Sequence, residues 1–186
     1  MITATVDQDA TGPVASLYED YRGLVEDLKD RSPSGLAALN RTYHKVILVA
    51  AASSLENQVK KVIGSMFCEH GRDELGMFVK NRVMDRGYHQ LFDWNAGKAK
   101  SFFSSFGPDC SRLFEEKIKS DIEFENQHFS FMRLGRLRNQ LVHQDYATYA
   151  LDETPDELFV LYRTAALFPG RFEEVIFAGT HTAVAG

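Results

Sequence analysis

Apolar residues recur at helical spacing along most of the chain, and no stretch alternates in the manner of a half-buried strand. Leucines and tyrosines at this spacing predict a first helix from Val14 to about Arg31. Residues 32–35 combine two serines with a proline and a glycine, so they should end this helix and cap the next. A longer helix is predicted from Leu36 to about Cys68. The pattern therefore predicts an all-α helical bundle.

The second half of the chain continues in the same way. Further helices are predicted over residues 73–85, 108–118, 121–146 and 154–168, with a short piece over 171–177. The glycine-punctuated stretch 87–108 is expected to be the least regular part. Residues 1–12 are small and polar and suggest a disordered lead-in, and residues 179–186 suggest a loose tail. The folded domain should span residues 13–178.

In the helix predicted over 121–146, Arg138 stands where a leucine is expected. At about 100° per residue, the apolar side chains near it on the helix fall within roughly 60° of its direction. These are Phe124, Phe131, Leu134, Leu141 and Val142, with Leu137 at the edge of the arc. A guanidinium on such a stripe must be paired, hydrogen-bonded or facing a wet crevice, since an unpaired one would cost several kcal/mol. We expect something anionic beside it.

Two polar residues follow Arg138 around the same helix. Asn139 lies about 100° from it and His143 about 140°, so these two side chains stack one turn apart. An imidazole can take up or release a proton near pH 7. A guanidinium can stabilise a phosphoryl centre as charge develops on it. Arg138, Asn139 and His143 are therefore the candidate catalytic residues.

The composition sets limits on the protein class. A chain of 186 residues with 44% hydrophobic and 25% charged residues is typical of one globular domain. Two cysteines form no disulfide framework, the N-terminus does not resemble a signal peptide, and the longest apolar run, residues 46–52, is too short to cross a membrane. A cytoplasmic location is expected. The histidines do not group at metal-ligand spacing, because Cys68 and His70 lack a second pair, so neither a metal nor another cofactor is expected.

Charge and aromatic content leave open whether part of the chain contacts nucleic acid. The net charge of −5 argues against a general nucleic-acid coat. Residues 78–100 nevertheless hold five basic and two acidic residues, which indicates either a solvated connection or a local surface for phosphates. Trp94 and the phenylalanines at 92, 102, 103 and 106 either close the core or offer a base-stacking surface.

The run from Leu137 to His143, Leu-Arg-Asn-Gln-Leu-Val-His, resembles the signature of the HEPN superfamily, an arginine followed four to six residues later by a histidine. Here four residues separate the two, and Asn139 matches the polar residue that usually follows the arginine. Residues 54–57, 94–107 and 156–175 resemble the RiboL-PSP branch of this superfamily. The resemblance covers most of residues 36–177.

This resemblance implies a HEPN-like helical bundle and a function. Many HEPN proteins are metal-independent endoribonucleases that leave a cyclic phosphate, and they commonly dimerise through the helix that carries the motif. By resemblance, His143 would handle the proton of the 2′-hydroxyl or of the leaving group. Arg138 would stabilise the pentavalent phosphate, and Asn139 would orient the phosphate or the imidazole. Such a homodimer would act on RNA in bacterial defence or a toxin–antitoxin system, and in the second case a cognate antitoxin or another partner protein is expected.

Other residues have weaker links to this site. Glu56 lies at the edge of the apolar face of the second long helix, where it either pairs with Arg138 or is an ordinary boundary residue. Tyr146 follows His143 by three residues, one more than the modified tyrosine of some HEPN toxins, so it is interpreted as a packing or cleft-wall residue. RNA contacts are expected from four basic residues: Arg133, Arg136, Lys98 and Lys100.

Two alternatives to a ribonuclease remain open on the sequence. The chain could be a non-catalytic HEPN module that binds RNA, a nucleotide or a protein partner. It could also be a purely structural dimerisation bundle in which Arg138 and His143 form a buried pair.

Overall fold

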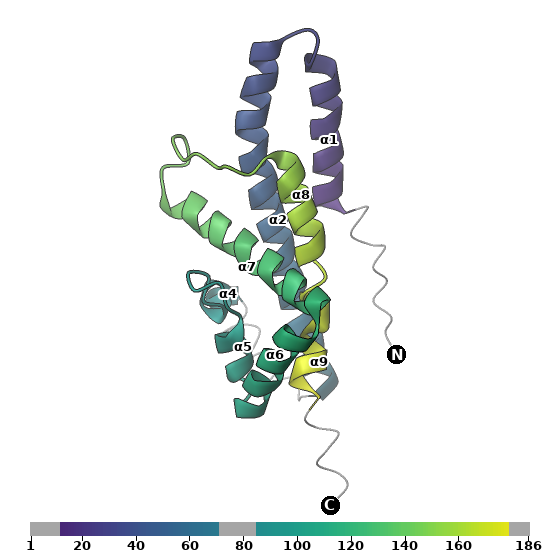
Figure 1. Cartoon of the computed structure of the whole chain (residues 1–186), viewed down its shortest axis with the longest axis vertical. Helices are drawn as coiled ribbons and strands as arrows, with labels where there is room; N and C mark the ends of the chain where they lie inside the picture. Colours follow the sequence, from purple (N-terminus) through teal and green to yellow (C-terminus); the bar gives the residue numbers. More distant parts are fainter. Residues whose placement is uncertain (1–11, 71–84, 179–186) are drawn as a thin grey trace, which may run out of the picture.

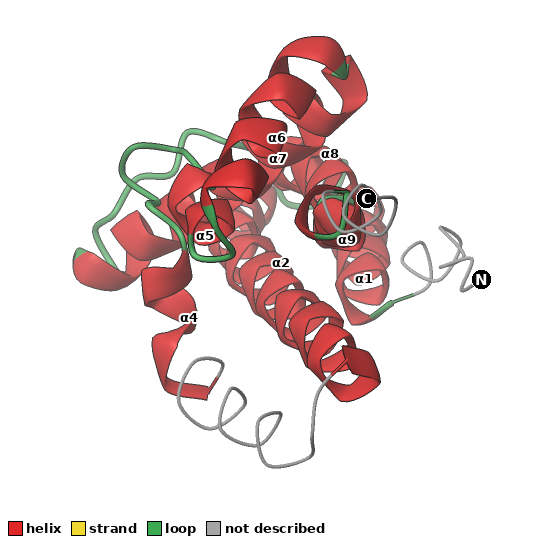
Figure 2. Ribbon diagram, turned by 90° about the horizontal axis from the view of Figure 1, so that it is seen from below, coloured by secondary structure: helices red, strands yellow, loops and turns green. Residues whose placement is uncertain are grey.

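In the computed structural model, which describes residues 12–70 and 85–178, every regular element is a helix (Figures 1 and 2). The elements in chain order are α1 (Pro13–Leu28), α2 (Pro33–His70), α4 (Asp85–Leu91), α5 (Lys100–Ser104), α6 (Pro108–Ser120), α7 (Ile122–His143), α8 (Pro155–Ala165), the 3₁₀ turn η3 (Pro169–Arg171) and α9 (Phe172–Ile176). The expected all-α fold is confirmed. Of the other sequence expectations, the helix over 73–85 falls outside the described residues except at its last position. Nearly all of the lead-in and all of the tail lie outside them as well.

The long helix α2 is the element around which the others are arranged. It forms an antiparallel hairpin with α1, and the hairpin extends beyond the rest of the molecule at the top of Figure 1. The helix α8 packs against both α1 and α2, while α7 packs across α2 and α8. The shorter helices α4, α5 and α6 gather near one end of the bundle, where α6 also contacts α7.

Local sequence signals explain where the main helices begin. Asp121 precedes α7, and its carboxylate accepts hydrogen bonds from the backbone N–H groups of Glu123 and Phe124. Thr154 precedes α8 and forms a reciprocal capping box with Glu157. These bonds satisfy N–H groups that a helix leaves free in its first turn, which is why the predicted starts are accurate.

The end of α7 and the width of its buried face differ from the prediction. The helix stops at His143 rather than near residue 146, because Gln144 adopts an extended conformation. Phe124, Phe131, Leu134 and Leu141 are fully buried, as the periodicity indicated. Val142 lies in the same arc by helical spacing but is 55% exposed, so it is not part of the buried face. Leu141 in the same last turn is fully buried, so the covered face of α7 is narrower there than the expected arc.

The aromatic residues of the irregular stretch pack into the core. Phe92, Trp94, Phe102 and Phe103 are all buried and form a connected set of ring contacts that reaches Phe131 on α7. Rings that are buried in this way cannot stack on bases in solution. Of the two interpretations left open by the sequence, these aromatics therefore close the core. Among the described helices, none combines the length and apolar character needed to span a bilayer.

Trp94 lies directly against the backbone of α7 at Gly135. A Cβ atom added to Gly135 would come within 2.0 Å of Cζ3 of the indole, so only glycine permits this close approach. The indole Nε1 also donates a hydrogen bond to the main-chain oxygen of His89, at 3.0 Å. Trp94 therefore connects α4 to the helix that carries the candidate catalytic residues.

We expect Gly135→Ala to destabilise the fold by about 1–3 kcal/mol, because the indole would have to move out of a packed core. Gly23→Ala in α1 is the matched control: no atom lies within 4 Å of its added Cβ, and alanine should stabilise that helix by up to about 1 kcal/mol. Urea denaturation followed by circular dichroism measures both changes. Equal stability of Gly135→Ala and the wild type would contradict the close packing.

Candidate active site

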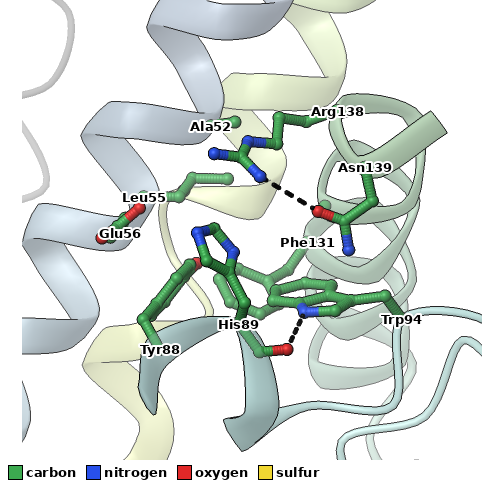
Figure 3. A pocket seen from close by; sticks show the side chains of 10 residues that line it. Ala52, Leu55, Glu56, Tyr88, His89, Trp94, Phe131, Arg138 and Asn139 are labelled. Carbon is green, nitrogen blue, oxygen red and sulfur yellow. Dashed lines mark hydrogen bonds between the residues drawn. The ribbon is translucent and has the colours of Figure 1, made fainter. Parts of the chain in front are cut away.

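A small pocket lies between α2, α4 and α7, and it contains the first two residues of the arginine–histidine motif (Figure 3). Its lining residues are Ala52, Leu55, Glu56, Tyr88, His89, Trp94, Phe131, Gly135, Arg138 and Asn139. Helical spacing brings the α7 residues to one side, because positions 131, 135, 138 and 139 lie on neighbouring turns of the same face. The pocket combines an apolar floor with a polar rim.

Arg138 reaches across this pocket from α7 toward α2. Its Nη1 donates a hydrogen bond to Oδ1 of Asn139 at 3.3 Å, and Figure 3 shows the guanidinium above the imidazole of His89. Arg138 is only partly buried, and it makes no ion pair with any carboxylate in the described part of the chain. The structure thus brings Arg138 and Asn139 together and leaves the positive charge without an anionic partner there.

Glu56 lines the same pocket from α2, but it does not pair with Arg138. Its Oε1 lies 2.7 Å from Nζ of Lys60, one turn further along α2, and both side chains are about one quarter exposed. The ion pair with Arg138 that the sequence left open is therefore not formed. Glu56 still contributes negative charge to the pocket, since its carboxylate acts electrostatically on both Tyr88 and His89.

His143 occupies the last position of α7, one turn beyond Asn139. Its side chain is exposed and is not part of the pocket lining. It lies near enough for its charge to act on His89 across the site. The structure thus places the motif histidine outside the pocket lining, while the arginine and asparagine are part of it.

Tyr88 and His89 were not identified from the sequence. Both lie on α4, in the stretch expected to be least regular, and no motif distinguished them. Burial and the charge of Glu56 raise the pKa of Tyr88. Partial desolvation, followed by the charge of Arg138, lowers the pKa of His89 and so favours its neutral form. Only the folded arrangement shows that α4 adds a second histidine to the site.

Tyr146 lies in the segment that follows α7 and is half exposed. Its main-chain oxygen accepts a hydrogen bond from Nζ of Lys45 at 2.6 Å, and the same ammonium lies 5.1 Å from the centre of the tyrosine ring. Lys45 is only 6% exposed, so this contact satisfies a buried charge. It anchors the chain just after His143 to α2, which fits the packing role expected for Tyr146.

The four basic residues expected to contact RNA are not part of the pocket lining. Arg133 is paired with Glu153, and Lys100 with Glu115, each at 2.5 Å. The Nε of Arg136 is buried and has no hydrogen-bond partner among the described residues. Lys98 is exposed and forms an isolated backbone bridge with Asp93. These contacts leave Lys98 as the freest of the four side chains.

His128, which is also on α7, belongs to the core. Its Nε2 accepts a hydrogen bond from the backbone N–H of Ala99, and its ring packs edge-on against Phe114 and Phe168. Burial lowers the pKa of His128 to about 4. Among the described residues, no group of three or more histidine, cysteine, aspartate or glutamate side chains could hold a metal ion. The side chains of Cys68 and His70 lie outside that description.

Comparison with known proteins places the chain in a family. The family model described as RiboL-PSP-HEPN matches residues 16–172. The chain belongs to the RiboL-PSP-HEPN family. The match runs from α1 to the start of α9, so it includes the pocket and all residues of the motif in this RiboL-PSP-HEPN domain. Neither the search of curated proteins nor the search of solved structures found a match.

His128 should make the stability of this RiboL-PSP-HEPN protein depend on pH. The pKa of the folded side chain is about 4, below the value of about 6.5 for an unburied histidine, so the unfolded chain takes up the proton first as the pH falls. His128 therefore destabilises the fold progressively from about pH 6.5 down to about pH 4. We expect His128→Gln to lose less stability than the wild type over this interval, by roughly 3 kcal/mol at most.

Urea denaturation of both proteins at pH 8 and pH 4.5 measures this difference. Glutamine retains an acceptor for the Ala99 N–H but does not titrate, so the comparison isolates the histidine from other groups. The same loss of stability in both proteins would show that His128 does not titrate in this way.

Proposed function

We propose that this protein is a metal-independent endoribonuclease of the HEPN type that acts as a homodimer. The proposal rests on the environment of Arg138. This guanidinium lies in a pocket between helices, is oriented by Asn139, and has no carboxylate partner in the described structure. A phosphate of RNA would supply the missing anion, because guanidinium and phosphate groups form strong charge-assisted hydrogen bonds.

The residues of the motif divide the chemistry between them. Arg138 stabilises the pentavalent phosphate, whose charge is greatest in the transition state. Asn139 holds the guanidinium through its Oδ1 and orients it toward the phosphate. His143 lies exposed at the end of α7, where it exchanges a proton with the 2′-hydroxyl or with the leaving oxygen. Cleavage by the 2′-hydroxyl gives a cyclic phosphate and needs no metal ion.

A homodimer formed through α7 is part of the proposal. Val142 and His143, next to each other at the end of α7, are both exposed, and Val142 presents an apolar surface for a second subunit. Two copies of Arg138 facing each other would repel unless an anion lay between them, so bound RNA phosphate would favour the dimer. Glu56 and Tyr146 would support the site, with the basic residues Arg133, Arg136, Lys98 and Lys100 contacting RNA beyond it.

The biological setting remains a proposal at the level of the family. A homodimeric ribonuclease of this kind would serve bacterial defence or act in a toxin–antitoxin pair. In the second case a cognate antitoxin or other partner protein would control the site. The cytoplasmic location expected from the sequence stays a prediction.

We expect His143→Ala and Arg138→Ala each to reduce RNA cleavage by at least about 100-fold, because each removes a group that acts in the transition state. The assay incubates labelled RNA with purified protein in the presence of EDTA and identifies the ends produced. A cyclic phosphate and a 5′-hydroxyl are the expected products. Thermal unfolding should show that both variants remain folded.

Two exposed neighbours provide matched controls for this assay. Gln144→Ala changes the residue after His143, and Arg163→Ala removes an exposed arginine on α8; both should cleave RNA as the wild type does. Wild-type protein that binds RNA with a steep salt dependence but cuts none would favour the non-catalytic module instead. No binding and no cleavage, with Arg138→Leu at least as stable as the wild type, would favour a structural bundle.

The proposed dimer makes a separate prediction about concentration. Specific cleavage activity should rise with protein concentration over the range in which sedimentation velocity shows monomers becoming dimers, because the active cleft is formed by two subunits. Val142→Asp should weaken both association and activity, since it places a charge on the proposed apolar contact. Full activity from a protein that stays monomeric throughout would exclude a composite cleft.

A further inference from the structure

His89 is the residue of the pocket whose role the motif does not explain. It lies on α4, outside the arginine–histidine motif, and its imidazole points toward the guanidinium of Arg138 in Figure 3. The side chain is exposed, unlike His128 on α7, so it is accessible to a ligand in the pocket. The pocket therefore has an imidazole of its own beside the arginine that is proposed to hold a phosphate.

The backbone at His89 is held in place from two sides. Its main-chain oxygen accepts the hydrogen bond from Nε1 of Trp94, and the indole packs against α7 at Gly135. The neighbouring residue, Tyr88, is 7% exposed and packs against Trp94 and Phe92. Tyr88 and Trp94 are thus buried, while the imidazole of His89 itself stays exposed. Its position relative to α7 is thus fixed by packing.

Charged and titratable groups face His89 from every helix around the pocket. Arg138 and His143 act on it from α7, and both disfavour its protonated form. Glu56 and Lys60 act on it from α2, with opposite effects that follow from their opposite charges. The ring of Tyr88 lies 5.5 Å away on α4 itself. Partial desolvation, Arg138 and Lys60 together outweigh Glu56, so the pKa of His89 is lowered.

We propose that His89 is a second catalytic residue of this site and accepts the proton of the attacking 2′-hydroxyl, while His143 protonates the leaving oxygen. This assignment rests on the proposed ribonuclease function and gives it a complete pair of proton-transfer groups. A neutral imidazole beside a phosphate-binding arginine suits the base, since it has a free acceptor nitrogen at pH 7. His143, at the exposed end of α7, is suited to act as the general acid.

The proposed step balances without any further reactant. The 2′-hydroxyl gives its proton to the free ring nitrogen of His89 while its oxygen forms a bond to phosphorus. The bond between phosphorus and the 5′-oxygen breaks, and that oxygen takes a proton from His143. Arg138 remains bound to the non-bridging oxygens throughout. The products are a 2′,3′-cyclic phosphate and a 5′-hydroxyl, with one imidazole protonated and the other deprotonated.

The first test compares His89→Gln with Gln90→Ala in cleavage of labelled RNA in EDTA. Glutamine can still hydrogen-bond but cannot exchange protons, so kcat/KM should fall by roughly 100-fold. Gln90 is the exposed neighbour on α4 and is not part of the pocket lining, so its variant should cleave as the wild type does. Wild-type activity in His89→Gln would overturn this inference alone, whereas an inactive wild type would remove the ribonuclease proposal with it.

A substrate with an activated leaving group separates the two histidines. Uridine 3′-(4-nitrophenyl phosphate) releases nitrophenolate, which needs no proton, but its 2′-hydroxyl must still be deprotonated. This substrate should restore activity to His143→Ala and leave His89→Gln impaired. Restoration of His89→Gln instead, with His143→Ala still impaired, would reverse the two roles and overturn the assignment.

The pH profile of the wild type tests the inference without relying on a folded variant. Activity should rise with pH through a value below 6.5, as His89 loses its proton and becomes able to act as the base. His89→Gln, where it folds, should lack this limb of the profile. A wild-type profile that is flat from pH 4.5 to 7 would overturn the role of His89.

Discussion

The close packing of Trp94 on the backbone of α7 is the contact on which the site depends. It is possible only because residue 135 is a glycine, and it connects the motif helix to α4 through the hydrogen bond to the His89 oxygen. The aromatic rings around Trp94 extend this contact into the core, where Phe131 and Phe92 are buried. One side of the pocket is thus built from core packing.

Arg138 shows how a folded domain can keep a cation at a helix interface. The guanidinium is only partly buried, which reduces the cost of removing it from water, and Asn139 satisfies one of its donors. Glu56 lies on the same pocket but is engaged by Lys60, so the positive charge of Arg138 is not cancelled by an ion pair. A charge that is left in this state is well suited to an anionic ligand and poorly suited to a purely structural role.

Much of the fold could be predicted from the sequence, because periodicity and capping residues act locally. The starts of α6 and α8 follow from proline and capping signals, and the buried face of α7 follows from helical spacing. The exposure of Val142 could not be predicted, because it depends on which side of the last turn of α7 other elements cover. Tyr88 and His89 were missed for a similar reason. Their place beside Arg138 depends on a tertiary contact between Trp94 and Gly135, and no local pattern encodes such a contact.

Some contacts of the site residues could likewise be predicted from the sequence, and others could not. The proximity of Arg138 and Asn139 follows from adjacent positions on one helix, whereas the pairing of Glu56 was open until the structure showed Lys60 within reach. The basic residues at 133 and 100 form ion pairs with Glu153 and Glu115, which the sequence did not indicate. Charge patterns along a chain indicate which groups exist, and only the fold determines which of them remain free.

The anchor between Lys45 and the segment after α7 has a consequence for how the two positions tolerate change. The acceptor at residue 146 is a backbone oxygen, so almost any side chain there preserves the bond. The donor is the side chain of Lys45, so methionine or alanine at position 45 would leave that oxygen without its ammonium partner. Substitutions should therefore destabilise the fold less at position 146 than at position 45, although both residues belong to the same contact.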